Sequence, residues 1–262
     1  MHHTSMSRRR FLQTTSAAAV WLPTSVRGYS ANEVQALFVD GEMQQDISKW
    51  ELDTPALCVD LDALEGNIAK MQNTTALNGI ASRPHAKTHK TPVIAQMQMD
   101  TGSVGICVAK VSEAEAMFQN GIDKILLTTT NVTATKIRRA MKLREVCGDF
   151  IQATDSPDNA RLLSEAAISM NIIADVVVDV DPGGNRTGIT PGQPALQLAQ
   201  LVDQLPGLRL RGLLCYDGGS QHVKGFDQRR SQTLSRLNAA SETYDLFNNS
   251  GLATEIFSGG GT

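Results

Sequence analysis

The chain has 262 residues, of which 41% are hydrophobic and 19% are charged, and its formal net charge at pH 7 is -3. This length allows a sizeable core, either as one α/β barrel or as two smaller domains. The slightly negative charge argues against general nucleic-acid binding, which needs a basic face to neutralise phosphates. The composition is otherwise ordinary for a globular protein, so a more specific function has to be sought in local motifs.

The first 31 residues differ in composition from the rest of the chain. Three consecutive arginines at positions 8–10 precede Phe11, Leu12 and a short apolar stretch. This layout is typical of an export signal, and the apolar stretch is too short to serve as a membrane anchor. The order of these residues resembles the twin-arginine signal of bacterial precursors, whereas the alternative is a basic terminus without a targeting role. We therefore expect residues 1–31 to direct export to the periplasm and residues 32–262 to form the folded domain.

From residue 52 onward, short β-rich runs alternate with segments of helical periodicity. Ser112 and Glu115, for example, are spaced as in a capping box and begin a helical pattern that Gly121 would end. Many of the expected strands are apolar enough to be buried on both faces, which predicts a parallel (β/α)8 barrel of the TIM type, with an open doubly wound sheet as the alternative. The eight expected strands span residues 56–60, 80–85, 104–108, 124–128, 150–154, 175–180, 210–216 and 254–257.

A barrel of this kind gathers its reacting groups at the carboxyl ends of the strands. After the last expected strand comes the run Ser258, Gly259, Gly260, Gly261 and Thr262. Three glycines leave successive backbone N–H groups unobstructed, so they can cradle an anion such as a phosphate, and the two hydroxyls add donors. The alternative is a flexible glycine-rich terminus.

Two other expected strands end in residues suited to binding a ring or an anion. The segment DVDPGGNRTG must turn sharply and presents Arg186 as a fixed cation, which could hold a carboxylate, a phosphate or a pyridine nitrogen. The alternative for Arg186 is a structural ion pair with Asp179 or Asp181. Tyr216, in the segment CYDGG, could stack on a ring or donate to a phosphate, or it could simply be packed.

The segment RPHAKTHK, residues 83–90, contains the candidate nucleophile Lys87. Neighbouring cations and burial at a barrel mouth would both favour the neutral amine, which forms Schiff bases. His85 and His89 flank Lys87 at two residues on either side, so a strand-like backbone would put all three on one face, where a histidine could move protons. A solvated basic turn is the alternative, but together with a glycine cradle and Arg186 the segment suggests pyridoxal phosphate as cofactor.

Six segments, taken in order, resemble the D-threonine aldolase and eukaryotic-type D-serine dehydratase family. They are DTPALCVDLDALEGNI, RPHAKTHK, GICVAKVSEAEAMFQNGIDKILLTT, VDVDPGGNRTGI, GLLCYDGG and SGGGT, and the likeness extends over about residues 48–262. The family consists of pyridoxal-phosphate enzymes with an N-terminal barrel like that of alanine racemase. The resemblance implies that Lys87 forms a Schiff base with the cofactor, that residues 258–262 bind its phosphate, and that Arg186 and Tyr216 lie at the cofactor.

The chain departs from the family pattern at its end and at one turn. Family members continue past the SGGGT segment into a helix and a C-terminal β domain, which supplies a His and an Asp or Cys for a divalent metal. This sequence stops at Thr262, so we expect a barrel without its last helix and a chain without the metal ligands. The family often has His after YDG, where this chain has Gly219.

The resemblance implies a lyase that cleaves D-threonine-like β-hydroxy-D-amino acids to glycine and an aldehyde. Dehydration of D-serine to pyruvate and ammonia is the alternative, and a fragment that binds pyridoxal phosphate without turnover is a third reading. His85 or His89 would move protons. A small D-amino acid is therefore the expected partner, nucleic acid and a membrane anchor are not expected, and a homodimer is implied by the resemblance.

Overall fold

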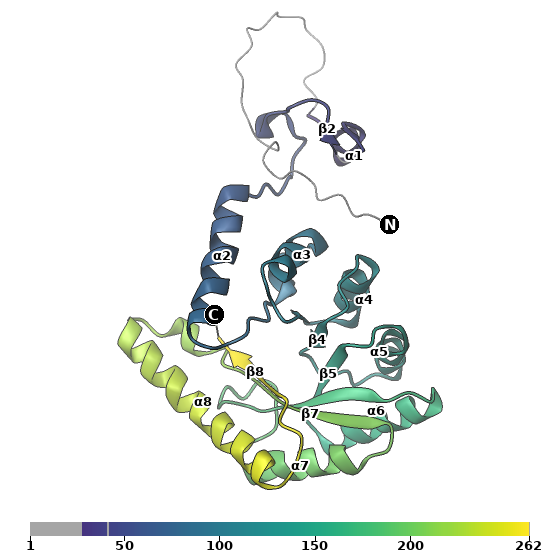
Figure 1. The fold of residues 1–262 in the computed structure, drawn as a ribbon, viewed down its shortest axis with the longest axis vertical. Helices are drawn as coiled ribbons and strands as arrows, with labels where there is room; N and C mark the ends of the chain where they lie inside the picture. Colours follow the sequence, from purple (N-terminus) through teal and green to yellow (C-terminus); the bar gives the residue numbers. More distant parts are fainter. Residues whose placement is uncertain (1–27, 41, 262) are drawn as a thin grey trace, which may run out of the picture. The chain divides into compact units, whose positions relative to one another are not determined.

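The computed structural model describes residues 28–40 and 42–261, so most of the expected export segment lies outside the described residues (Figure 1). The chain divides into two units, Met1–Glu65 and Gly66–Thr262. None of the helices described is long and apolar enough to cross a membrane.

The described part of the first unit is small and carries little regular structure. Helix α1 (Ala31–Ala36) begins at Ser30, which forms a capping box with Glu33. Strands β1 (Phe38–Val39) and β2 (Glu42–Met43) form an antiparallel pair, and a 3₁₀ turn, η2 (Lys49–Glu51), follows. Residues 56–60, expected to form the first barrel strand, form neither helix nor strand, and Leu57 is fully exposed. A strand needs a partner, and the only strands described in this unit pair with each other.

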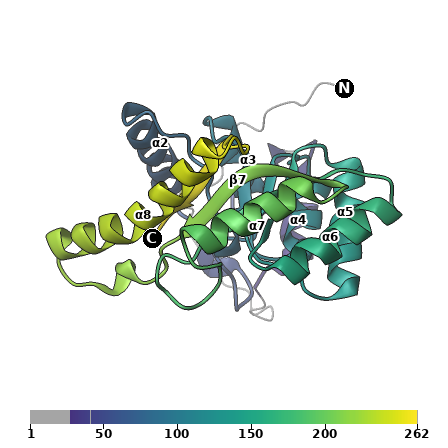
Figure 2. The same ribbon diagram turned by 90° about the horizontal axis from the view of Figure 1, so that it is seen from below.

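The second unit is a parallel six-stranded sheet with helices packed along it (Figures 1 and 2). The strands are β3 (Ile106–Val108), β4 (Ile125–Leu127), β5 (Phe150–Thr154), β6 (Ala174–Asp179), β7 (Leu208–Tyr216) and β8 (Ile256–Gly260). The helices are α2 (Leu61–Leu77), which begins in the first unit, α3 (Pro92–Asp100), α4 (Val111–Gln119), α5 (Ala134–Val146), α6 (Pro157–Ser169), α7 (Gln193–Gln204) and α8 (Phe226–Asn249). Two further 3₁₀ turns are η3 (Ala86–Thr88) and η4 (Ser220–His222).

The strand order β3-β4-β5-β6-β7-β8 follows the chain without a reversal. A doubly wound sheet would reverse its order at a switch point, so this sheet is wound in one direction only, as in a barrel. The strands contribute to two layers of core, because side chains alternate along each strand. Ile106 and Val108 pack toward the helices, whereas Cys107 faces a smaller inner cluster. The inner cluster consists of Cys107, Leu126, Ile151, Ala153, Val177 and Leu214.

The second expected strand, residues 80–85, lies along β3 without becoming a strand. Its carbonyl groups are paired, since Val104 N–H donates to Ser82 O (2.9 Å) and Cys107 N–H donates to Pro84 O (2.8 Å). Within residues 80–85, all of which the structure describes, a single isolated β-bridge forms, between His85 and Cys107. Pro84 has no N–H to donate, which explains why the pairing is confined to a single bridge. The structure therefore has six of the eight expected strands.

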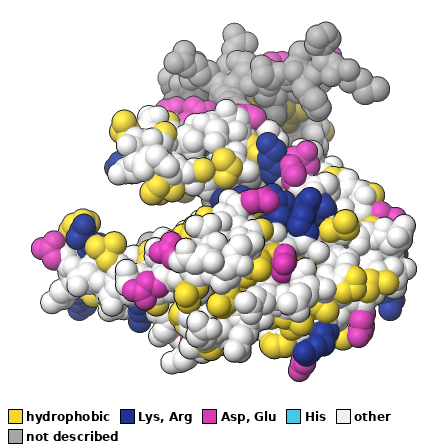
Figure 3. Space-filling model, turned by 60° about the horizontal axis from the view of Figure 1, so that its bottom comes forward, with side chains coloured by type: hydrophobic (Ala, Val, Ile, Leu, Met, Phe, Trp, Pro, Cys, Tyr) yellow, Lys and Arg dark blue, Asp and Glu magenta, His cyan; other side chains and the backbone are white. Residues whose placement is uncertain are grey.

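On the face drawn in Figure 3, basic and acidic side chains are interspersed among hydrophobic ones.

Candidate active site

The carboxyl ends of β6, β7 and β8 lie at one edge of the sheet, because neighbouring parallel strands point the same way. Three predicted site residues meet at this edge. The Nζ atom of Lys87, in η3, lies 5.0 Å from the centroid of the Tyr216 ring at the end of β7. The Cζ atom of Arg186, in the loop after β6, lies 5.4 Å from the same centroid. Two cations from distant parts of the sequence therefore contact one aromatic ring.

The loop that carries Arg186 is held by Asp181. Its Oδ1 atom accepts the N–H groups of Gly183 (2.9 Å) and Gly184 (2.7 Å), and its Oδ2 atom accepts the N–H of Asn185 (3.0 Å). In the part of the chain that the structure describes, Arg186 forms no ion pair with Asp179 or Asp181. The side chain of Arg186 is exposed at the edge of the sheet, where a ligand can reach it.

Asp179, the last residue of β6, is a buried acid beside this loop, 4% exposed. Burial raises the pKa of its carboxyl to about 7, and the nearby Asp155 and Asp181 act in the same direction. A hydrogen bond with Thr187 and the charge of Arg186 oppose this increase. Asp179 can therefore gain or lose a proton near neutral pH.

His85 supports the backbone of Lys87. Its Nδ1 atom accepts the N–H of Lys87 (3.2 Å), so in the neutral ring the proton is on Nε2, which lies 3.2 Å from Oγ1 of Thr128. That hydroxyl donates to Val108 O (3.1 Å). Burial lowers the pKa of His85 to about 4, assisted by the charge of Lys87. His85 is therefore neutral at pH 7 and holds η3 against β3 and β4.

The expectation that His85, Lys87 and His89 share one face of a strand is wrong. Residues 86–88 form the 3₁₀ turn η3, in which the two-residue alternation of a strand is lost. His89 ends this turn, its Nδ1 atom accepts the N–H of Thr91 (3.0 Å), and burial lowers its pKa. Lys87 is itself exposed, so the burial expected for its amine is not found in the described structure.

The glycine run was expected to form a loop after the last strand, but most of it belongs to that strand. Ser258, Gly259 and Gly260 belong to β8, and Gly260 pairs with Tyr216. A Cβ atom at Gly259 would lie 2.4 Å from Cys215 O, and one at Gly261 would lie 2.7 Å from Asp217 O. Only glycine allows this close approach. Thr262, the last residue of the predicted phosphate site, lies outside the described residues.

Asp217 directly follows Tyr216 at the end of β7, and the sequence motifs gave it no role. It is completely buried, and its Oδ1 atom accepts the N–H groups of Gly219 (3.1 Å) and Ser220 (3.2 Å) and a bond from Nη1 of Arg236 (2.6 Å). Its backbone N–H donates to Gly260 O (2.8 Å). The order Asp-Gly-Gly-Ser in the sequence is the signal that could have identified it, because such a run favours an aspartate-capped turn.

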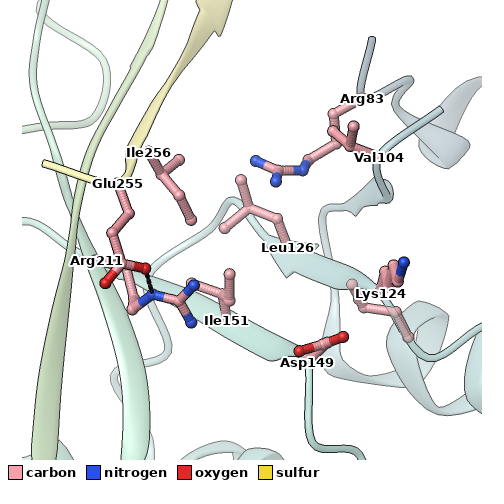
Figure 4. A pocket seen from close by; sticks show the side chains of 10 residues that line it. Arg83, Val104, Lys124, Leu126, Asp149, Ile151, Arg211, Glu255 and Ile256 are labelled. Carbon is pink, nitrogen blue, oxygen red and sulfur yellow. Dashed lines mark hydrogen bonds and ion pairs between the residues drawn. The ribbon is translucent and has the colours of Figure 1, made fainter. Parts of the chain in front are cut away.

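A pocket of about 400 Å³ lies at the opposite end of the strands (Figure 4). Arg83 and Arg211 point into it from two sides, with Leu126, Ile151 and Ile256 between them. In α/β barrels this amino end contributes to stability, whereas chemistry takes place at the carboxyl end. None of the predicted site residues lines the pocket. Among residues 28–40 and 42–261, no group of three His, Cys, Asp or Glu side chains is placed to hold a metal.

Residues 59–262 match the family described as the alanine racemase N-terminal domain. A 3-hydroxy-D-aspartate aldolase of Paracoccus denitrificans (strain Pd 1222) is 35% identical over 213 residues, which are 81% of this chain and 55% of that protein. A D-threo-3-hydroxyaspartate dehydratase of Delftia sp. (strain HT23) is 33% identical over 175 residues, 66% of this chain and 45% of that protein. The crystal structure of D-threonine aldolase from Filomicrobium marinum is 39% identical, with a TM-score of 0.78 over 81% of this chain and 57% of that chain.

The chain therefore belongs to the alanine racemase N-terminal domain family. Its relatives include proteins named 3-hydroxy-D-aspartate aldolase and D-threonine aldolase, and its six-stranded sheet has the alanine racemase-like fold, so the predicted fold class and resemblance are confirmed. The chain spans about half the length of the curated relatives that it matches.

Proposed function

We propose that this protein is a pyridoxal-phosphate-dependent lyase that acts on β-hydroxy-D-amino acids. The observation that carries the proposal is the convergence of Lys87 and Arg186 on the Tyr216 ring, at the carboxyl end of the strands. The family match supports it, because pyridoxal phosphate is the cofactor expected of alanine racemase-like proteins. The names of the relatives support a lyase of D-configured substrates.

The residues at this edge fit such a cofactor. Lys87 supplies a primary amine that can bond to an aldehyde carbon, and its backbone is held by His85. Arg186 supplies a fixed cation and Tyr216 a flat face, which suit the substituted ring. The glycines at positions 259–261 have no side chains that would obstruct a phosphate approaching their backbone N–H groups. When bound, the cofactor would supply an electron sink for charge that develops at the substrate Cα.

The reaction of a D-threonine-like substrate would be a retro-aldol cleavage. The Cα–Cβ bond breaks, the β-hydroxyl loses its proton as the aldehyde forms, and Cα gains a proton to give glycine. Asp179, whose pKa is raised to about 7 by burial, and His85, whose pKa is lowered to about 4, are titratable groups beside the Arg186 loop and Lys87. We assign to His85 the support of Lys87, and to Asp181 that of the loop which carries Arg186.

Dehydration is the second candidate, and the likeness to a D-threo-3-hydroxyaspartate dehydratase favours it. In that reaction the Cα proton and the β-hydroxyl leave, and the product hydrolyses to a keto acid and ammonia. D-Serine would give pyruvate and ammonia. The same lysine and glycine run would be used, so the two reactions differ in their products rather than in the binding residues described here.

Product analysis separates the candidates. The purified protein, supplied with pyridoxal phosphate, is incubated with D-threonine, 3-hydroxy-D-aspartate and D-serine. Glycine with an aldehyde indicates the aldolase, and keto acid with ammonia indicates the dehydratase. Lys87→Ala should abolish both the reaction and the visible absorbance of the lysine-bound cofactor, whereas Lys142→Ala, on the exposed side of α5, should change neither.

Two outcomes would contradict the proposal. Turnover that persists in Lys87→Ala would show that the amine is elsewhere. Cofactor binding to the wild type with no product from any of the three substrates would favour a protein that binds pyridoxal phosphate without turnover.

A further inference from the structure

The turn after β7, residues 217–220, forms hydrogen bonds both with the glycine run and with helix α8. Asp217 lies at its centre, and Arg236 of α8 reaches the Oδ1 atom of Asp217 at 2.6 Å. Gly219 allows this approach, because a Cβ atom there would lie 2.4 Å from Nη1 of Arg236. The carboxylate is therefore fixed from two sides, by a helix and by the N–H groups of its own turn.

The backbone of Asp217 is in turn bonded to the glycine run. Its N–H donates to Gly260 O, and its carbonyl oxygen occupies the space that a Cβ atom of Gly261 would need. A displacement of Asp217 would therefore move both glycines. These are the residues whose N–H groups are assigned to the phosphate.

We propose that Asp217 is a positioning residue for cofactor binding, with Arg236 as its anchor: together they hold Gly260 and Gly261 where the phosphate of pyridoxal phosphate is bound. The inference rests on the proposed function, because it takes the glycine run as the phosphate site. Asp217 does not touch the cofactor in this account.

The opposite charges of Asp217 and Arg236 are compatible with a position beside a bound phosphate. Burial alone would raise the pKa of Asp217, but hydrogen bonds from Ser220, Arg236 and Gly219 outweigh it and hold the pKa below its ordinary value. The group is therefore a carboxylate at neutral pH. A lone carboxylate so close to a phosphate would repel it, and the guanidinium of Arg236 removes this repulsion.

A purely structural ion pair is the competing explanation, and the chain offers a matched control for it. Asp175, near the amino end of β6, is equally buried and accepts bonds from Arg209 and from Arg211 (2.9 Å). This cluster lies at the opposite end of the sheet from the glycine run. Both Asp217→Asn and Asp175→Asn should lower the free energy of unfolding, since each replaces a buried carboxylate that accepts charged hydrogen bonds from arginine.

The experiment compares pyridoxal phosphate with pyridoxal, which has the aldehyde but not the phosphate. For each folded variant, both dissociation constants are measured from the visible absorbance of the bound ligand. Asp217→Asn should weaken binding of pyridoxal phosphate about tenfold or more, with little change for pyridoxal. Asp175→Asn should leave the ratio of the two constants unchanged. Arg236→Gln should reproduce the effect of Asp217→Asn, and it serves in its place if that variant does not fold.

Amide hydrogen exchange without any cofactor gives an independent readout. Exchange at residues 259–261 should increase in Asp217→Asn and Arg236→Gln, and should stay at the wild-type rate in Asp175→Asn. An unchanged ligand ratio together with unchanged exchange in both test variants would overturn the inference. If the wild type bound neither ligand, the proposed function would fail, while hydrogen exchange would still decide whether Asp217 positions the glycines.

Discussion

The ring of Tyr216 is the point on which the side chains of this site converge. Lys87 and Arg186 contact it, and a Cβ atom at Gly218 would lie 2.8 Å from its Cε1 atom and 3.4 Å from Nη1 of Arg186. Position 218 thus leaves space that the aromatic ring and the guanidinium both occupy. The arrangement depends on the absence of a side chain as much as on the three side chains present.

Gly218→Ala tests this packing. The added methyl should displace Tyr216 and Arg186, and misplacement of this size should lower kcat/KM by up to about a hundredfold. The matched control is Gly148→Ala, which has nothing within 4 Å of the new Cβ atom. Steady-state kinetics with the substrate identified by product analysis would reveal the difference. Equal kinetics for the two variants would show that the Tyr216–Arg186 contact is dispensable.

Asp179 should make stability depend on pH. Because its folded pKa is raised to about 7, the folded protein binds a proton that the unfolded chain has lost, so the stabilisation is complete below about pH 4 and disappears as the pH rises to 7. The side chain in Asp179→Asn does not ionise, so this variant does not lose that stabilisation as the pH rises. Relative to the wild type, its free energy of unfolding should therefore increase by a few kcal/mol between pH 5 and pH 8.

Urea unfolding of both proteins across this pH range provides the measurement. His85, whose pKa is lowered to about 4, contributes with the opposite sign, since its stabilisation is lost as the pH falls from about 6.5 toward 4. It is present in both proteins, so the comparison isolates Asp179. A difference between them that does not vary with pH would contradict the assignment.

At the scale of the elements, sequence patterns located the strands well where apolar runs were long. The runs that became β5, β6 and β7 are buried along most of their length, and their expected positions agree with the structure to within two residues. Gly121, at a φ of 88°, lies just beyond the end of α4 as expected. The approximate positions of Arg186 and Tyr216 near the ends of β6 and β7 could therefore be predicted from the chain alone, whereas Lys87 lies in η3 and does not follow a strand.

The exact start of a helix and the exact end of a strand could not be predicted in the same way. The expected capping box of Ser112 and Glu115 is not formed: α4 begins after Lys110, Glu113 accepts the N–H of Ala109 (2.8 Å), and Glu115 pairs with Arg139 of α5. Likewise β8 continues to Gly260, because pairing with β7 outweighs the low strand propensity of glycine. These choices depend on neighbours that are distant in sequence.

The close packing of the β8 glycines against β7 can be tested by substitution. In Gly259→Ala the new Cβ atom would meet Cys215 O at 2.4 Å, so β8 must move away from β7. We expect the free energy of unfolding to fall by about 1–3 kcal/mol, the usual cost of overpacking. Gly66→Ala in α2, where nothing lies within 4 Å, should be neutral or stabilising. Equal stability of the two variants in thermal unfolding would contradict the close approach.

For the whole molecule, two expectations depend on parts of the chain outside the described residues. Export by a twin-arginine signal concerns residues 8–12, and the last phosphate donor concerns Thr262. Export and the homodimer remain predictions. What the described residues add is a sheet with separate ends: arginines and the pocket at the amino end, and a lysine, an arginine, a tyrosine and glycines at the carboxyl end.

The most direct test of the account is to locate the bound cofactor. Wild-type protein loaded with pyridoxal phosphate is treated with borohydride, which makes the bond between the aldehyde carbon and the amine permanent, and its peptides are then analysed by mass spectrometry. The account predicts a phosphopyridoxyl group on Lys87 and on no other lysine. Its presence on Lys90 or Lys110 instead, or an absence of modification in protein that is folded and saturated with cofactor, would contradict the central claim.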